Sequence, residues 1–99
     1  MGKAISQRAI VSTIREQIST KLGDEEVILH LQKGTYFGLN EVGAFIWGRI
    51  QTPMAVRQIL DEMLREFDVD EATCAKDLTA ILRELEKKGL IKVRNERVD

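Results

Sequence analysis

The chain is poor in the residue types on which many enzymes and metal proteins depend. Its 99 residues include one histidine, His30, and one cysteine, Cys74. One cysteine cannot form an internal disulfide, and one His with one Cys falls short of the four ligands of a structural zinc site. A catalytic triad or a Cys-His pair would need His30 beside a nucleophile, but it lies among apolar residues. We therefore expect no enzyme activity, no metal and no cofactor, with His30 at the surface or rim and Cys74 in the core.

A surplus of charge of either sign is also missing. The sequence has 15 Lys and Arg against 16 Asp and Glu, a net charge of −1 and a pI of about 5.9. Such a balance creates no overall field for nucleic acid or an anionic membrane. No segment approaches the roughly 18 consecutive apolar residues of a membrane span. We expect no nucleic acid and no membrane among the partners, and the unpaired cysteine favours a cytoplasmic location.

The first half of the chain alternates apolar and polar residues with a period of two, as half-buried strands do. One apolar set is Ile18, Thr20 and Leu22, and the next is Val27, Leu29 and Leu31. The turn signals Gly23-Asp24 and Lys33-Gly34 separate these segments from each other and from a third strand, Thr35–Leu39. Links this short predict an antiparallel meander with the third strand at one edge of the sheet.

After Asn40, a good helix N-cap, the period changes to 3.6 residues. Thr52-Pro53 is expected to begin a second helix, Asp68–Asp70 to separate it from a third, and Gly89 to end the third. Residues 90–93 could form a short final strand. The apolar stripes of the three helices are Val42, Phe45, Ile46 and Ile50; Val56, Ile59, Leu60, Met63, Leu64 and Phe67; and Cys74, Leu78, Ile81, Leu82 and Leu85.

These elements predict an α+β fold, a three-stranded antiparallel sheet followed by three helices in a winged-helix-like arrangement. The expected organisation is an N-terminal arm over residues 1–15, one domain over 16–93 and a C-terminal tail over 94–99. Within the arm, Ile10, Val11 and Ile14 fit either a helical turn or an extended segment.

An edge strand in a chain without catalytic residues favours peptide capture. The free backbone groups of the edge strand can pair with an extended peptide, while the third helix walls the far side of the groove. Tyr36 and Phe37 are neighbours in a strand and must point to opposite faces, so one joins the core and the other stays exposed. The candidate peptide-binding residues are Thr35, Tyr36, Phe37, Gly38 and Leu39 on the strand, and Cys74, Asp77, Leu78, Ile81 and Glu84 on the helix.

The segment around the predicted edge strand also carries a family pattern. The pattern residues are Gly34, Tyr36, Phe37, Leu39, Asn40, Glu41, Gly43, Ile46 and Trp47. In these residues the chain resembles the PqqD family, small domains that recognise the leader peptides of ribosomally synthesised, post-translationally modified peptides. The resemblance extends over about residues 16–93, and Thr52-Pro53, Asp68-Val69 and Cys74 look most like the stand-alone members of lasso-peptide biosynthesis. It implies that a leader peptide adds to the third strand, packs on the third helix and is delivered to a separate leader peptidase or other modifying enzyme, which performs the chemistry.

Two alternatives stay open. The chain could be an adaptor for a radical SAM enzyme of PQQ-type biosynthesis, or a winged-helix regulator that binds DNA. The second and third helices could form a helix-turn-helix, but on the third helix the acidic residues balance the basic ones. A recognition helix without surplus positive charge lacks the phosphate attraction on which DNA affinity depends.

Overall fold

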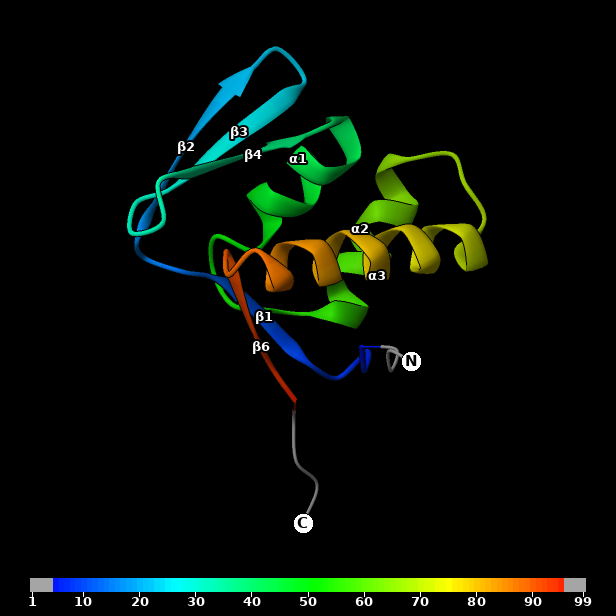
Figure 1. The fold of residues 1–99 in the computed structure, drawn as a ribbon. Helices are drawn as coiled ribbons and strands as arrows, with labels where there is room; N and C mark the ends of the chain where they lie inside the picture. Colours follow the sequence, from blue (N-terminus) through cyan, green and yellow to red (C-terminus); the bar gives the residue numbers. More distant parts are fainter. Residues whose placement is uncertain (1–4, 96–99) are drawn as a thin grey trace.

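A computed structural model describes residues 5–95, so the first four residues of the expected arm and the last four of the expected tail lie outside it (Figure 1). The sequence-based fold class is confirmed: an antiparallel sheet of three strands is followed by three helices. Three further strands form a second small sheet. In chain order the elements are β1 (Ile10–Thr13), β2 (Gln17–Leu22), β3 (Glu25–His30), β4 (Thr35–Leu39), α1 (Glu41–Arg49), β5 (Met54–Ala55), α2 (Val56–Glu66), α3 (Glu71–Lys87) and β6 (Ile91–Arg94).

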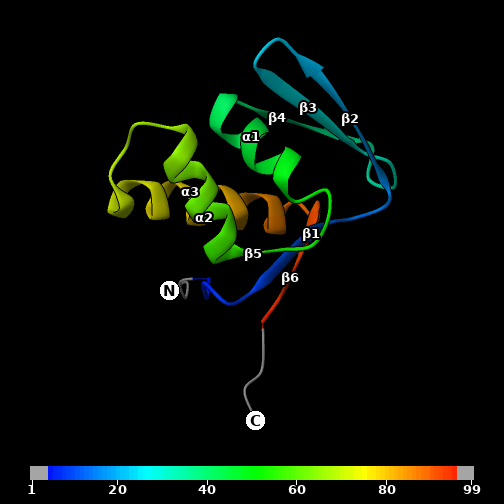
Figure 2. The same ribbon diagram turned by 180° about the vertical axis from the view of Figure 1, so that it is seen from behind.

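The larger sheet is the expected meander. Its strand order is β2-β3-β4 with antiparallel pairing throughout, so β4 lies at one edge and β2 at the other. The helices lie on one side of this sheet, as Figures 1 and 2 show from opposite directions. We call the side toward the helices the inner face and the opposite side the outer face. Short links and the left-handed glycines Gly23 and Gly34 (φ of 65° and 67°) produce the tight reversals between strands.

The alternating apolar sets predicted for β2 and β3 do not form the buried sides of these strands, so this part of the prediction is wrong. Ile28 is completely buried in β3, whereas Leu31 is 49% exposed and Ile18 on β2 is 57% exposed. The buried positions of β3 are Glu26, Ile28 and His30, one residue out of step with the predicted set. Both alternating sets of β3 contain apolar residues, and a shift of one residue moves every side chain to the other face. The apolar pattern of these strands therefore lies mostly on the outer face.

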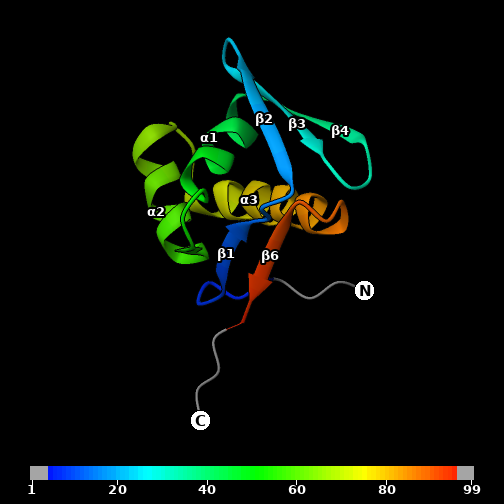
Figure 3. The same cartoon turned by 90° about the vertical axis from the view of Figure 1, so that its left-hand side faces the viewer.

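The second sheet places the start of the chain in the core. Its order is β5-β1-β6, with β1 pairing antiparallel to both neighbours (Figure 3). Of the two conformations considered for Ile10 and Val11, the structure has the extended one. Ala9 and Val11 are completely buried, and the short strand predicted near residues 90–93 is β6, which pairs with β1. The first and last strands of the domain are thus held together by backbone pairing.

Local capping signals fix the ends of α1 and α3. The Asn40 side chain accepts a hydrogen bond from the Gly43 N–H (2.9 Å), and Asp70 accepts one from the Thr73 N–H (2.7 Å). Gly89, with φ of 74°, ends α3, and the Leu90 N–H donates to the Leu85 carbonyl (2.9 Å). These sequence-based expectations are confirmed.

The expected start of the second helix at Thr52-Pro53 is wrong. Helix α2 begins at Val56, because Met54 and Ala55 form β5 against β1. The first free N–H groups of α2 donate to the N-terminal segment: Val56 to the Ala9 carbonyl (2.9 Å) and Arg57 to the Gln7 carbonyl (2.9 Å). Distant backbone carbonyls therefore cap a helix that no local side chain caps.

The core lies between the helices and the inner face of the larger sheet. Trp47 is 2% exposed and donates its indole N–H to the Ser19 hydroxyl on β2 (3.1 Å), which ties α1 to the far edge of the sheet. The remaining fully buried large side chains are Ile28, Ile46, Ile50, Ile59, Leu60, Met63, Leu78, Leu82, Leu85, Leu90 and Val11. Phe45 and Phe67 pack edge to face at 5.3 Å between ring centres.

The expectation that His30 lies at the surface or rim is wrong. His30 is 6% exposed on the inner face of β3, and its Nδ1 accepts a hydrogen bond from the Lys33 N–H (3.2 Å). The bond closes the turn between β3 and β4, so the ring satisfies a local backbone donor. Its role in the structure is to shape the turn that leads into the edge strand.

Candidate peptide-binding groove

The edge strand β4 leaves one row of backbone groups without a partner strand among residues 5–95. It pairs with β3 from Glu26↔Leu39 to His30↔Thr35, and no other strand in this part of the chain borders it. Side chains alternate as predicted: Tyr36 is 71% exposed on the outer face, and Phe37 is half-buried against the core on the inner face. The strand therefore offers both an open edge and an apolar inner side.

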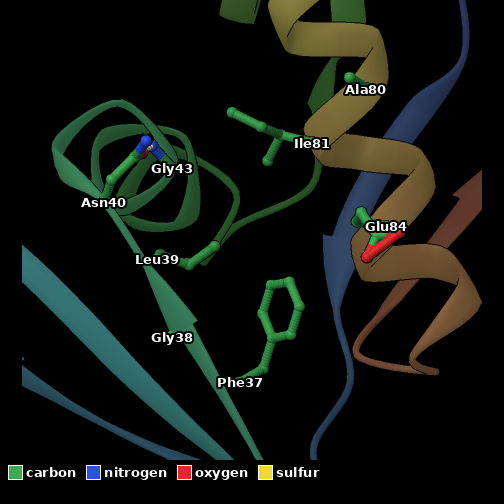
Figure 4. Close-up of a pocket in the computed structure, with 8 residues that line it drawn as sticks. All are labelled: Phe37, Gly38, Leu39, Asn40, Gly43, Ala80, Ile81 and Glu84. Atoms are coloured by element: carbon green, nitrogen blue, oxygen red, sulfur yellow. Dashed lines mark hydrogen bonds between the residues drawn. The ribbon is translucent and has the colours of Figure 1, made fainter.

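A groove with a volume of about 230 Å³ runs between β4, the start of α1 and α3. In Figure 4, Phe37 projects from β4 toward α3, and Ile81 and Glu84 project from α3 toward the strand. The groove is lined by Phe37, Gly38, Leu39, Asn40, Gly43, Ala80, Ile81 and Glu84.

The junction of β4 with α1 shapes one end of the groove. The strand ends at Leu39, which is 7% exposed, and Asn40 begins the helix at once through its cap to Gly43. Gly43 allows Leu39 to lie against the helix, because a Cβ at this position would sit 2.9 Å from Leu39 Cδ2. A tight turn without a bulky side chain thus keeps this end of the groove open.

The wall formed by α3 combines an apolar centre with acidic ends. Ile81 is half-buried at the border of the core, and Ala80 beside it leaves room above the helix. Glu84 stands at one end, and Asp77 lines an adjoining hollow with Val42 and Ile81. An extended chain lying here would meet apolar contacts in the middle and carboxylates on either side.

The groove lining contains one ionisable side chain, Glu84, and neither a thiol nor an imidazole. Cys74 is 1% exposed, and burial, followed by the charges of Asp77, Asp70 and Glu71, raises the pKa of its thiol. A neutral buried thiol is a poor nucleophile and a small core residue. Over residues 5–95 no three His, Cys, Asp or Glu side chains gather in a way that could hold a metal ion. In the same residues no helix is long and apolar enough to cross a membrane.

The structure brings together most, but not all, of the predicted site residues. Phe37, Gly38, Leu39, Ile81 and Glu84 line the groove, and Asp77 lines the hollow beside it. Thr35 and Tyr36 are exposed on β4 outside the groove, while Cys74 and Leu78 are buried beneath it.

Sequence reasoning missed three groove residues. The sequence indicates Asn40 and Gly43 as helix-capping and family-pattern positions, and in the structure both also border the groove. Ala80 gave no signal at all, since an alanine on a helix marks neither a core stripe nor a charged face. Its spacing of three residues from Asp77 and four from Glu84, both predicted site residues, places it on the same face of the helix and could have indicated it.

Two solved structures share this fold. One, described as TbiB1 in complex with the TbiA(beta) leader peptide, has 36% sequence identity and a TM-score of 0.76, and the match covers 89% of this chain and 99% of that one. The other, lasso peptide synthetase B1 complexed with the leader peptide, has 20% identity and a TM-score of 0.73, with 83% and 96% covered, and shows the fold alone. No match was found among curated proteins.

A family model gives the same classification from sequence. The model of coenzyme PQQ synthesis protein D (PqqD) matches residues 25–91, a span that contains β3, β4, all three helices and the start of β6. The matched segment therefore includes both walls of the groove. On this match, and on the 36% identity with a structure covered almost completely, the chain belongs to the PqqD family.

Proposed function

We propose that this chain binds the leader peptide of a ribosomally synthesised peptide precursor, of the lasso class, and presents it to a separate leader peptidase or other modifying enzyme. The observation that carries the proposal is the open edge of β4 beside an apolar groove walled by α3. The relative with 36% identity supports it, because the description of that structure names a bound leader peptide.

Strand addition explains how such a surface holds a flexible peptide. The leader pairs its backbone with the open edge of β4, and every second leader side chain faces α3. Backbone pairing does not distinguish sequences, so selectivity comes from the groove. Phe37, Leu39 and Ile81 select an apolar leader residue there, and Asp77 and Glu84 disfavour acidic neighbours.

In this function the chain is an adaptor and not an enzyme. The groove contains no nucleophile and no general base suited to cleave or modify a peptide, so the chemistry belongs to the partner enzyme. The precursor and that enzyme would both meet the chain in the cytoplasm. An adaptor for a radical SAM enzyme would use the same groove, but the resemblance of Thr52-Pro53, Asp68-Val69 and Cys74 to stand-alone members of lasso-peptide biosynthesis favours the lasso class.

Isothermal titration with the leader peptide of the precursor encoded beside this chain tests the proposal. We expect one site with a dissociation constant in roughly the micromolar to sub-micromolar range, about −8 to −10 kcal/mol. Titration with the scrambled leader is the control and should give no heat. Equal heats for the native and scrambled leaders, or none for either, would contradict the proposal.

A further inference from the structure

The outer face of the β2–β3–β4 sheet is apolar and uncovered. No helix or strand within residues 5–95 packs on it, since α1, α2 and α3 lie on the opposite side (Figures 1 and 2). Strand alternation assigns its side chains, which are Ile18, Thr20, Leu22, Glu25, Val27, Leu29, Tyr36 and Gly38. Ile18, Leu22 and Tyr36 are 57%, 58% and 71% exposed, and only Glu25, at the end of the hairpin, is charged.

The register aligns the apolar residues of this face in a row across the sheet. Ile18 pairs with Leu29, and Leu29 pairs with Tyr36 at the open edge. A peptide added to β4 would extend the row by one strand, because the leader side chains that do not face α3 point to the outer face beside Tyr36. The outer face and the bound leader thus form one continuous surface.

We propose that the outer face is the docking surface for the enzyme that processes the bound precursor, with the row of Ile18, Leu29 and Tyr36 as its main contact. This inference rests on the proposed function, because the enzyme must reach a leader that lies along β4. The inner side of that leader is occupied by α3, so an enzyme that contacts the complex near the leader meets the outer face. The matching surface of the enzyme is uncharged and apolar, because the outer face carries only one carboxylate, and that lies at its rim.

The size of the face favours such a partner over a second copy of this chain. Three strands of at most six residues span roughly 20 Å by 14 Å, about 300 Å² of flat area. A stable interface needs about 800 Å² per partner. The face alone is too small for a lasting dimer, whereas an enzyme that also holds the leader and the rest of the precursor has further contacts. Binding of the enzyme would then depend on the leader being present.

A lysine in the Ile18–Leu29–Tyr36 row tests the inference. Ile18→Lys places a charge two strands away from β4 and outside the groove, so leader affinity measured by calorimetry should change less than about twofold. Cleavage of the precursor by the leader peptidase encoded with it should require at least about tenfold more of the variant, because a buried unpaired charge weakens the interface. Gln58→Lys, on the exposed side of α2, is the matched control and should behave as the parent chain.

Thr20→Glu keeps the test decisive if Ile18→Lys fails to fold. Thr20 is exposed in the middle row of the same face, and its replacement removes no apolar contact. Normal cleavage with a folded variant would overturn the docking surface while leaving leader binding intact. A dimer of the parent chain in sedimentation that Ile18→Lys dissociates would assign the face to a second copy instead. If the parent chain binds no leader, the proposed function fails and this inference fails with it.

Discussion

In the proposed function, the selectivity of the groove depends most on Ile81. It lies on α3 between the core and the open space above Phe37, bordered by Asp77 on one side and Glu84 on the other. In Ile81→Glu a carboxylate replaces the apolar centre of the wall. Because an unpaired charge facing an apolar leader residue costs several kcal/mol, leader affinity should fall by about a hundredfold or more in calorimetry.

Lys76→Glu provides the comparison. Lys76 is exposed on α3 and does not line the groove, so leader affinity should stay close to that of the parent. Both variants must melt within a few degrees of the parent for the comparison to count. If Ile81→Glu keeps full affinity while Lys76→Glu loses it, the leader lies on the other side of α3.

Two glycines give a matched test of backbone conformation. Gly89 has φ of 74°, where an alanine is strained, and Gly48 lies in α1 with open space around it. Urea unfolding should show Gly89→Ala lowering the free energy of unfolding by about 1 kcal/mol and Gly48→Ala raising it by roughly 0.5 kcal/mol. Two changes of the same sign would show that neighbouring contacts, and not backbone preference, decide stability at these positions.

Single-residue signals in the sequence predicted the helix caps, which depend on near neighbours. They failed where a contact distant in the sequence decides whether a side chain is buried. Asn40, Asp70 and Gly89 cap helices through bonds to residues within three or four positions, and the sequence identified all three. His30 has no local signal for burial. Its position on the inner face follows from the register with β4, and its Nε2 lies near Gly89, a residue almost 60 positions away in the sequence.

At the scale of elements, β4 is the strand whose backbone should change on binding. Its outward-directed N–H groups should exchange rapidly in the absence of a leader, and strand addition would give them partners. Hydrogen–deuterium exchange should therefore show protection at alternate residues between Thr35 and Leu39 when leader is added. The amides at the edge of β2 serve as the internal reference and should not change. Protection on β2 or β6 in place of β4 would move the site to a different edge.

The elements themselves could be predicted from periodicity, but not their boundaries or faces. The start of α2 is set by β5, whose two residues pair with Ile10 and Val11 more than 40 positions earlier in the chain. The inner face of β2 is set by Trp47, whose indole N–H reaches Ser19. The candidate site was predictable to the same extent: β4, the stripe of α3 and the burial of Cys74 could be predicted, while the opening at Ala80 depends on packing.

At the scale of the whole molecule, the first strand holds the second sheet together. Strand β1 lies between β5 and β6, and Ala9 and Val11 are completely buried. A chain that begins at Glu16 would lose these contacts and leave β5 and β6 without a partner. We expect it to lose its cooperative thermal transition in circular dichroism, because such a loss approaches the 5–15 kcal/mol total stability of a small domain.

Val11→Ala is the milder version of the same change. Removing two buried methyl groups should lower the free energy of unfolding by about 2 kcal/mol and leave a cooperative transition. If residues 1–15 are instead an arm outside the domain, as the sequence predicts, a chain that begins at Glu16 should keep its cooperative transition. A chain from Glu16 that melts as sharply as the parent would support this division of the chain.

Among residues 5–95, no strand pairs with the outer edges of the larger sheet, β2 on one side and β4 on the other. If β4 of one molecule paired with β2 of the next, the contact would be head to tail, and repeated contacts of this kind build a filament when the rotation between copies does not close a ring. A leader bound along β4 blocks one of the two ends and stops growth after a single addition. The substrate would then act as a chain terminator, and the protein would be least prone to polymerise when it is saturated with the peptide that it serves.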